Sequence, residues 1–159
     1  RLIELKDSTW THVRNGLYKV ANEPKGTAWW RRGLGNQMAG KTGTSQVIKA
    51  TSEKDLYSKC SEKEYKYRHH GLFVSFAPYE NPKIAVAALV EHGCGSSAAV
   101  PVVEKVVSTY MKKYLPEKQK EYAELEKRQY SRFIQKRNRA REEAEAQKRE
   151  EETEASGEE

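Results

Sequence analysis

The segment HGLFVSFAPYENPKIAVAALVE, residues 70–91, decides the fold of this 159-residue chain. Residues 70–77 and 83–91 are rich in β-branched, aromatic and small apolar side chains, which is typical of strands. Residues 78–82 lie between them and contain two prolines, a composition that indicates a turn. Because a connection of about five residues favours strands of opposite direction, the segment predicts an antiparallel hairpin.

A third strand and a first helix are predicted before this hairpin. Small and β-branched residues make 38–48 a strand, whereas the polar residues 49–68 indicate a surface insertion. A helix is expected over about 8–21, with Asp7 and Ser8 as its N-cap pair. Its predicted apolar face comprises Trp10, Val13, Leu17 and Val20.

A second helix is predicted after the hairpin. It follows the loop 92–97, in which Ser96 and Ser97 are the candidate caps, and it ends before Pro116. Paired apolar residues recur every four positions, at 102/103, 106/107, 110/111 and 114/115, and predict a strongly buried face. The order helix, three antiparallel strands, helix predicts an α+β fold, with helices packed on an antiparallel sheet of three strands.

The composition changes at Pro116. Residues 1–116 carry a net charge of +8 and hold all three tryptophans and both cysteines, whereas residues 117–159 carry −2. We therefore divide the chain into a body, 1–116, and a charged helical or disordered tail, 117–159. Sparse apolar residues at helical spacing predict an amphipathic helix over 117–136, followed by a fraying helix or disorder.

The composition also restricts the class of protein. No stretch approaches the ~18 apolar residues of a membrane span, and no secretory signal is visible. Two cysteines are too few for a disulfide scaffold or a four-cysteine zinc site. Because the chain begins at Arg1 rather than at Met, we expect a C-terminal piece of a longer protein. The basic body predicts an anionic partner, whether nucleic acid, a membrane surface or a substrate with carboxylates.

The strongest chemical signal is the segment Lys41-Thr42-Gly43-Thr44. On a strand, Lys41 and Gly43 share one face, and Thr42 and Thr44 share the other. Strand twist near an edge lets the ammonium lean towards the hydroxyls, and a cation with two hydroxyls suits a carboxylate. Gly43 leaves room for a ligand backbone to lie against the strand. These residues predict a carboxylate-binding site, and the alternative is an ordinary edge strand.

Several strings in the right order resemble the class B penicillin-binding proteins. They are GTA at 26–28, AGKTGTSQV at 39–47, FAPYENPKIAVA at 76–87 and VEHG at 90–93. The similarity covers about residues 8–115 and is strongest to the members that act in cell elongation, whereas 117–159 has no recognised counterpart. It implies the C-terminal part of a penicillin-binding/β-lactamase-like transpeptidase fold, to which Lys-Thr-Gly contributes one of three site motifs.

This resemblance implies a peptidoglycan D,D-transpeptidase that forms an acyl-serine intermediate and binds penicillin. Lys41 and Thr44 would be catalytic, through the positive field of the ammonium and an oxyanion-hole N–H of Thr44. Thr42, Gly43 and Thr44 would bind the donor peptide and its terminal carboxylate. The implied partners are stem peptides, β-lactam antibiotics and a membrane glycosyltransferase of the elongation machinery. The implied location is the periplasm or cell exterior, with a membrane anchor upstream.

The nucleophile of that family is missing from the chain. Neither Ser-x-x-Lys nor Ser-x-Asn occurs in the 159 residues, so we expect both upstream of Arg1 and expect the chain alone to be inactive. Two other interpretations stay open. One is a fragment of a serine β-lactamase or D,D-carboxypeptidase, and the other is a non-catalytic scaffolding or binding module whose tail is the working part.

The remaining candidate residues point to no further chemistry. The adjacent His69 and His70 and the two cysteines do not fit a zinc spacing, so we expect no metal and no cofactor. Cys60 and Cys94 either form a disulfide or remain lone thiols. The run Trp29-Trp30-Arg31-Arg32 interleaves aromatic and cationic residues, as single-strand nucleic-acid binders do. Without a basic helical stripe or a recognised module, we expect no nucleic acid and place this run near the substrate groove or a partner.

Overall fold

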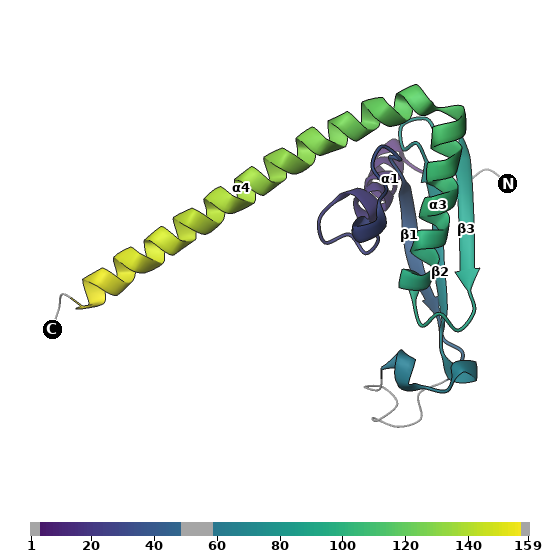
Figure 1. Cartoon of the computed structure of the whole chain (residues 1–159), viewed down its shortest axis with the longest axis horizontal. Coiled ribbons are helices and arrows are strands. Elements are labelled where there is room, and N and C mark those ends of the chain that lie inside the picture. Colours follow the sequence, from purple (N-terminus) through teal and green to yellow (C-terminus); the bar gives the residue numbers. More distant parts are fainter. Residues whose placement is uncertain (1–3, 49–58, 157–159) are drawn as a thin grey trace.

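The computed structural model describes residues 4–48 and 59–156 (Figure 1). It contains three α-helices, three strands and three short 3₁₀ turns within these ranges. In chain order the elements are α1 (Asp7–Asn22), η1 (Trp29–Arg31), β1 (Ala39–Ser45), η2 (Cys60–Glu62), η3 (Tyr65–Tyr67), β2 (His70–Ala77), β3 (Ile84–Val90), α3 (Ser96–Tyr114) and α4 (Pro116–Ser156). Part of the predicted surface insertion, residues 49–58, lies outside the described residues.

The three strands form one antiparallel sheet in the order β1-β2-β3, as predicted. The register sets Thr42 opposite Phe73 and Thr44 opposite Gly71. Residues that face each other across antiparallel strands point to the same side of the sheet. Thr42 and Thr44 therefore share the side of Phe73, whereas Lys41 shares the side of Val74.

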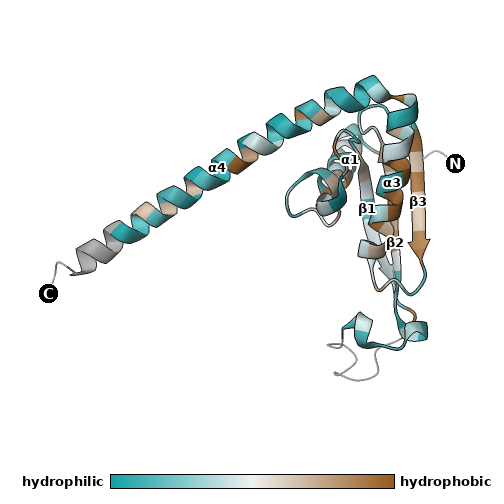
Figure 2. Cartoon of the chain, viewed as in Figure 1, coloured by the Kyte–Doolittle hydropathy of each residue, from teal (hydrophilic) through white to brown (hydrophobic). Residues whose placement is uncertain are grey.

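One side of the sheet carries the core. α3 packs across β2 and β3, and α1 lies along β1 (Figure 1). The centre of this layer is fully buried and comprises Met38, Phe73, Ala99, Val100, Val103, Val107 and Met111. The opposite side is open along β2 and β3, where Val74 and Leu89 are about half exposed. Figure 2 shows β3 as the most continuously hydrophobic strand.

The predicted apolar faces of the helices are only partly buried. On α3 one member of each of the first three pairs is buried, at Val103, Val107 and Met111, while Val102 and Val106 are exposed and neither member of the 114/115 pair is buried. A single sheet layer covers about one side of a helix, so the second column of side chains turns away from it. On α1 the predicted face is largely exposed, and Ala21 is the buried residue of this helix.

The predicted side-chain caps are wrong for both helices. α1 begins at Asp7, so Asp7 and Ser8 lie in its first turn, and the N-cap Lys6 makes no side-chain capping bond. The Asp7 carboxylate still carries the charge that suits a helix N-terminus. The N-cap of α3 is Gly95, and its carbonyl accepts a hydrogen bond from the Ala98 N–H at 3.1 Å.

The tail is helical over nearly its whole length. α4 runs unbroken from Pro116 to Ser156 and so includes the residues after 136. Figure 2 shows it mostly hydrophilic, and its side chains form exposed ion pairs three or four residues apart, such as Lys127 with Glu124. Such pairs stabilise a helix by about 0.2–0.5 kcal/mol each. They support a polar helix that lacks a continuous apolar face.

Substituting Gly71 by alanine should destabilise the chain. A Cβ at this position of β2 would lie 2.0 Å from the carbonyl oxygen of Gly95, so the start of α3 would have to move. We expect a loss of about 1–3 kcal/mol, typical of overpacking, measured by urea denaturation. Gly16→Ala is the matched control, because no atom lies within 4 Å of its Cβ position. This control should stabilise α1, and equal effects of the two substitutions would contradict the predicted contact.

Candidate functional site: an exposed Lys-Thr-Gly-Thr edge strand

β1 forms the edge of the described sheet and carries the predicted site residues. Its first residues, Ala39 and Gly40, are buried, whereas Lys41 and Thr44 are exposed and Thr42 is half-buried. The sheet pairs β1 with β2 along one edge, and no other described strand pairs with its second edge. An exposed strand edge presents backbone groups that can pair with an extended ligand.

The Lys41 side chain lies along its own strand. Its Nζ donates a hydrogen bond of 2.8 Å to the backbone carbonyl of Thr42. The expectation that the ammonium leans towards the hydroxyls is therefore not met, because the Thr42 carbonyl oxygen accepts its hydrogen bond. The ammonium nevertheless remains exposed and adjacent to Thr42.

Thr42 has a partner that the sequence analysis missed. The hydroxyls of Thr42 and Thr27 lie 2.9 Å apart, and either can be the donor. Thr27 precedes η1 and belongs to the Gly26-Thr27-Ala28 string. The sequence signal for this contact was that the string stands ahead of the Lys41–Thr44 strand among the family-like segments. The backbone of this segment lies close to α1: a Cβ built on Gly26 would be only 2.3 Å from the Lys19 carbonyl oxygen. The pair therefore extends the hydroxyl surface of the edge strand.

Thr44 lies beside the start of α3. A Cβ built on Gly95 would be 3.7 Å from the Thr44 Oγ1. The neighbouring Gly43 is not required by packing, since a Cβ there would meet only Leu72, at an ordinary 3.4 Å. The lack of a side chain at Gly43 leaves the strand flat beside the two exposed residues, Lys41 and Thr44.

A disulfide between Cys60 and Cys94 resolves the alternative left open by the sequence. It joins η2 to the turn that precedes α3, next to Gly95. The Cys94 N–H also donates to the His69 carbonyl at 2.8 Å, and the His92 N–H donates to His70 Nδ1 at 2.9 Å. These bonds tie the turn before α3 to the start of β2.

The Trp-Trp-Arg-Arg run makes intramolecular contacts. The Arg32 guanidinium lies 5.0 Å from the centre of the Trp29 ring and 5.4 Å from that of Tyr130 on α4, and Arg31 lies over Trp30. Such cation–π contacts stabilise by about 0.5–1 kcal/mol each at exposed sites. The aromatic and cationic residues of this run, whose pattern is similar to that of single-strand nucleic-acid binders, thus contact other side chains of the same chain.

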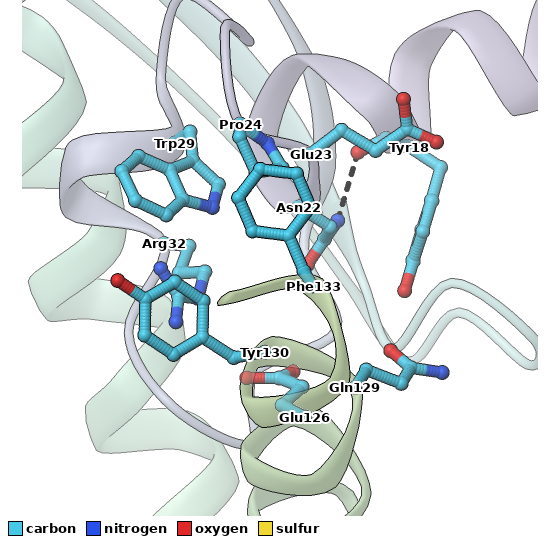
Figure 3. Close-up of a pocket in the computed structure, with 10 residues that line it drawn as sticks. All are labelled: Tyr18, Asn22, Glu23, Pro24, Trp29, Arg32, Glu126, Gln129, Tyr130 and Phe133. Carbon is cyan, nitrogen blue, oxygen red and sulfur yellow. Dashed lines mark hydrogen bonds between the residues drawn. The ribbon is translucent and has the colours of Figure 1, made fainter. Parts of the chain in front are cut away.

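A cavity of about 300 Å³ lies between α1, η1 and α4, away from the edge strand (Figure 3). Its lining includes Tyr18, Trp29, Arg32, Glu126 and Tyr130. Glu126 is only 6% exposed, and burial raises the pKa of its carboxyl, opposed by hydrogen bonds from Gly35 and Gln37. Burial likewise raises the pKa of the Tyr18 hydroxyl. No member of Lys41–Thr44 lines this cavity.

Within residues 4–48 and 59–156, no three His, Cys, Asp or Glu side chains gather as metal ligands would. None of the helices in the described part of the chain has the length and apolar character needed to cross a membrane.

Residues 3–111 match the family described as the penicillin-binding protein transpeptidase domain. Because the match covers well over half of the chain, the chain belongs to this family. This membership agrees with the α+β architecture and with the resemblance carried by the Lys41–Thr44 strand.

The relatives point to one branch of the family. The chain is 34% identical over 119 residues to the peptidoglycan D,D-transpeptidase MrdA of Haemophilus influenzae, and 32% identical over 111 residues to that of Escherichia coli K12. These alignments cover 72% and 68% of this chain, but only 18% and 17% of the relatives. The chain thus spans less than a fifth of the length of these relatives.

Solved structures give the same result. A Helicobacter pylori penicillin-binding protein, PBP2, described in complex with MreC, superimposes with a TM-score of 0.57 at 34% identity. That match covers 70% of this chain and 19% of the other. A Pseudomonas aeruginosa PBP2, solved in complex with WCK 5153, gives a TM-score of 0.56 at 34% identity, covering 72% and 22%. The expected similarity to the elongation-type members is confirmed.

Proposed function

We propose that this chain is the part of a peptidoglycan D,D-transpeptidase that supplies the Lys-Thr-Gly strand of the active site. The observation that supports this function most directly is the exposed edge strand Lys41–Thr44 in a chain that belongs to the transpeptidase family. The nucleophilic serine and its Ser-x-x-Lys motif would come from residues outside this chain, because the 159 residues contain no such motif.

The reaction is acyl transfer in two steps. The serine oxygen attacks the carbonyl carbon between the two terminal D-alanines of a stem peptide, and its proton passes to a base. The C–N bond then breaks, and the terminal D-alanine leaves with a proton on its nitrogen. An amine of a neighbouring stem attacks the resulting ester, forms the cross-link and returns the serine hydroxyl.

The edge strand would bind and polarise the donor peptide. The peptide would lie along the free edge of β1, as extended ligands add to sheet edges. The Lys41 ammonium and the hydroxyls of Thr42 and Thr44 would hold its terminal carboxylate through charge-assisted hydrogen bonds. The backbone N–H of Thr44 would donate to the oxyanion that forms at the attacked carbonyl, a contact worth about 3 kcal/mol in comparable sites.

The location and the partners follow from the same proposal. The Cys60–Cys94 disulfide suits an oxidising compartment such as the periplasm, where a domain tethered by an upstream anchor would meet peptidoglycan. A membrane glycosyltransferase of the elongation machinery would supply the glycan strands that carry the stem peptides. The description of the Helicobacter pylori relative in complex with MreC supports a protein partner for the complete enzyme. β-Lactams would acylate the same serine.

Thr44→Ala should weaken acylation moderately. The substitution removes the hydroxyl but keeps the backbone N–H, so we expect an acylation efficiency about 10- to 100-fold lower, from the loss of one hydrogen bond to a charged group. Most of the loss should appear in the affinity for β-lactam before acylation, measured by stopped-flow titration. Thr109→Ala, an exposed threonine on α3, is the control and should have no effect. A loss beyond 100-fold for Thr44→Ala would contradict the separation of hydroxyl and backbone roles.

The test of the proposed function is covalent labelling of the complete protein by a fluorescent penicillin. A stable adduct that forms on one serine supports the transpeptidase. Rapid turnover of the penicillin would indicate a β-lactamase instead. A complete protein that lacks Ser-x-x-Lys and does not label would favour a non-catalytic module.

A further inference from the structure

The tail helix α4 contacts the loop that leads into the edge strand. Glu126 accepts two hydrogen bonds, from the backbone N–H of Gly35 at 3.1 Å and from Gln37 Nε2 at 3.0 Å. Two helical turns before Glu126 on α4, Gln119 Nε2 donates a hydrogen bond to Asn36 Oδ1 at 3.1 Å. Three consecutive loop residues are thus bound from one helix, which lies beyond the residues 3–111 that match the family.

The contact between α4 and this loop is close and buried. Asn36 is fully buried, and Gln37 and Glu126 are each 6% exposed. Gly35 has a φ of +77°, and a Cβ there would lie 2.2 Å from the carbonyl oxygen of Gln119. Because only glycine fits both this conformation and this spacing, the loop is shaped to accept α4.

The loop is also bound from the side of the body. The Met38 carbonyl accepts a hydrogen bond from Asn22 Nδ2 on α1 at 2.6 Å, and the Gln37 carbonyl accepts one from the Tyr79 N–H at 2.8 Å. β1 begins one residue after Met38, and Lys41 follows four residues after Gln37, about 13 Å along an extended strand. The position of the loop therefore sets where the edge strand begins.

Glu126 is the central group of this contact. Its two acceptor bonds come from a backbone donor and a side-chain amide donor, and Arg32 is the charged group that faces it. Leu125 and Phe133 on the same helix remain exposed, whereas Tyr122 packs against the core and Tyr130 contacts Arg32. The contacts of α4 with residues 35–37 themselves include the two hydrogen bonds to Glu126, and removal of this carboxylate would break both.

We propose that Glu126 is a positioning residue of the transpeptidase: from α4 its carboxylate fixes residues 35–37 and thereby holds the Lys41–Thr44 strand in place for the acyl donor. This inference rests on the proposed function. It assigns part of the charged tail to the active-site domain, whose family match ends at residue 111.

The experiment measures acylation of the complete protein by a fluorescent penicillin. Glu126→Ala should lower the acylation rate constant about tenfold, in line with the loss of hydrogen bonds to a charged group. Glu126→Gln keeps one acceptor oxygen and should recover part of the rate. Glu124→Ala is the matched control, because this exposed glutamate pairs with Lys127 on its own helix and should leave the rate unchanged. The final amount of label reports the folded fraction, so a purely structural effect would lower the amount and not the rate.

A pH profile gives a second readout. Burial raises the pKa of the Glu126 carboxyl, so protonation begins at a higher pH than for an exposed glutamate. A protonated oxygen no longer accepts its hydrogen bond. Arg32 faces this carboxyl, and so does the Tyr18 hydroxyl, whose own pKa is raised by burial. The ratio of the wild-type rate to the Glu126→Gln rate should therefore decrease as the pH is lowered, and the decrease should begin at a higher pH than the titration of an exposed glutamate.

The outcomes separate the two proposals. A wild-type protein that does not label overturns the proposed function, and the positioning role with it. A wild-type protein that labels, together with a Glu126→Ala variant that labels at the same rate, overturns the positioning role alone. If Glu126→Ala does not accumulate as folded protein, Gln119→Ala decides: a rate lowered about two- to fivefold supports the role, and an unchanged rate overturns it.

Discussion

Replacement of Lys41 by alanine in the complete protein should slow acylation by a fluorescent penicillin at least about 100-fold. The reason is electrostatic, since the substitution removes the exposed cation of the edge strand, which would neutralise the carboxylate of the donor or antibiotic. The fold should be unaffected, because substitution of an exposed side chain usually changes stability by less than about 0.5 kcal/mol. Stopped-flow measurement of the acylation rate, together with a thermal unfolding curve, checks both statements.

The control for Lys41→Ala is Lys83→Ala. Lys83 is also exposed, but it lies just before β3, which forms the opposite edge of the sheet. Its loss lowers the net charge by the same amount and should leave acylation unchanged. Acylation of Lys41→Ala within threefold of the wild-type rate would remove the main support for a carboxylate site on β1.

Removal of the disulfide should give the largest change in stability. The Cys60→Ser, Cys94→Ser double variant opens a loop between residues 34 positions apart, which in the chain-entropy account costs about 3–4 kcal/mol. Urea denaturation of the chain measures the loss. A reducing agent should lower the wild-type midpoint towards that of the variant and should not affect the variant itself.

An unchanged midpoint of wild type in reducing agent would contradict this prediction. It would mean that the turn before α3 is held without the disulfide, by the Cys94–His69 and His92–His70 hydrogen bonds alone. Acylation kinetics of the same variant would then show whether Thr44, which lies beside Gly95, depends on the disulfide.

The strands and their order followed from the sequence, because the relevant signals are local. Residues 70–77 were predicted as a strand with the bounds that the structure gives, and the two-proline turn fixed the direction of the next strand. The residue types of Lys41–Thr44 located the candidate site, and the family resemblance then assigned their roles. The roles of these residues remain predictions, while their exposure on an edge strand is observed.

The sequence did not predict the contacts made across the chain. Glu126 is one of 13 acidic residues in the tail, and nothing local distinguishes it from the exposed glutamates beside it. Its burial arises because α4 passes beside the loop at Gly35. Similarly, the disulfide needs the start of β2 and the end of β3 to meet at one end of the sheet. The exposed column on α3 escaped prediction because periodicity cannot say how much of a helix its neighbours cover.

The uncovered side of the sheet has a practical consequence. Val74 and Leu89 leave adjoining hydrophobic surface in contact with water, and Val102 and Val106 form a separate exposed apolar surface on α3, which packs on the other side of the sheet. Contiguous apolar surface of this kind drives self-association in dilute buffer. Light scattering on the isolated polypeptide should therefore report particles that grow with concentration, and mild detergent should disperse them.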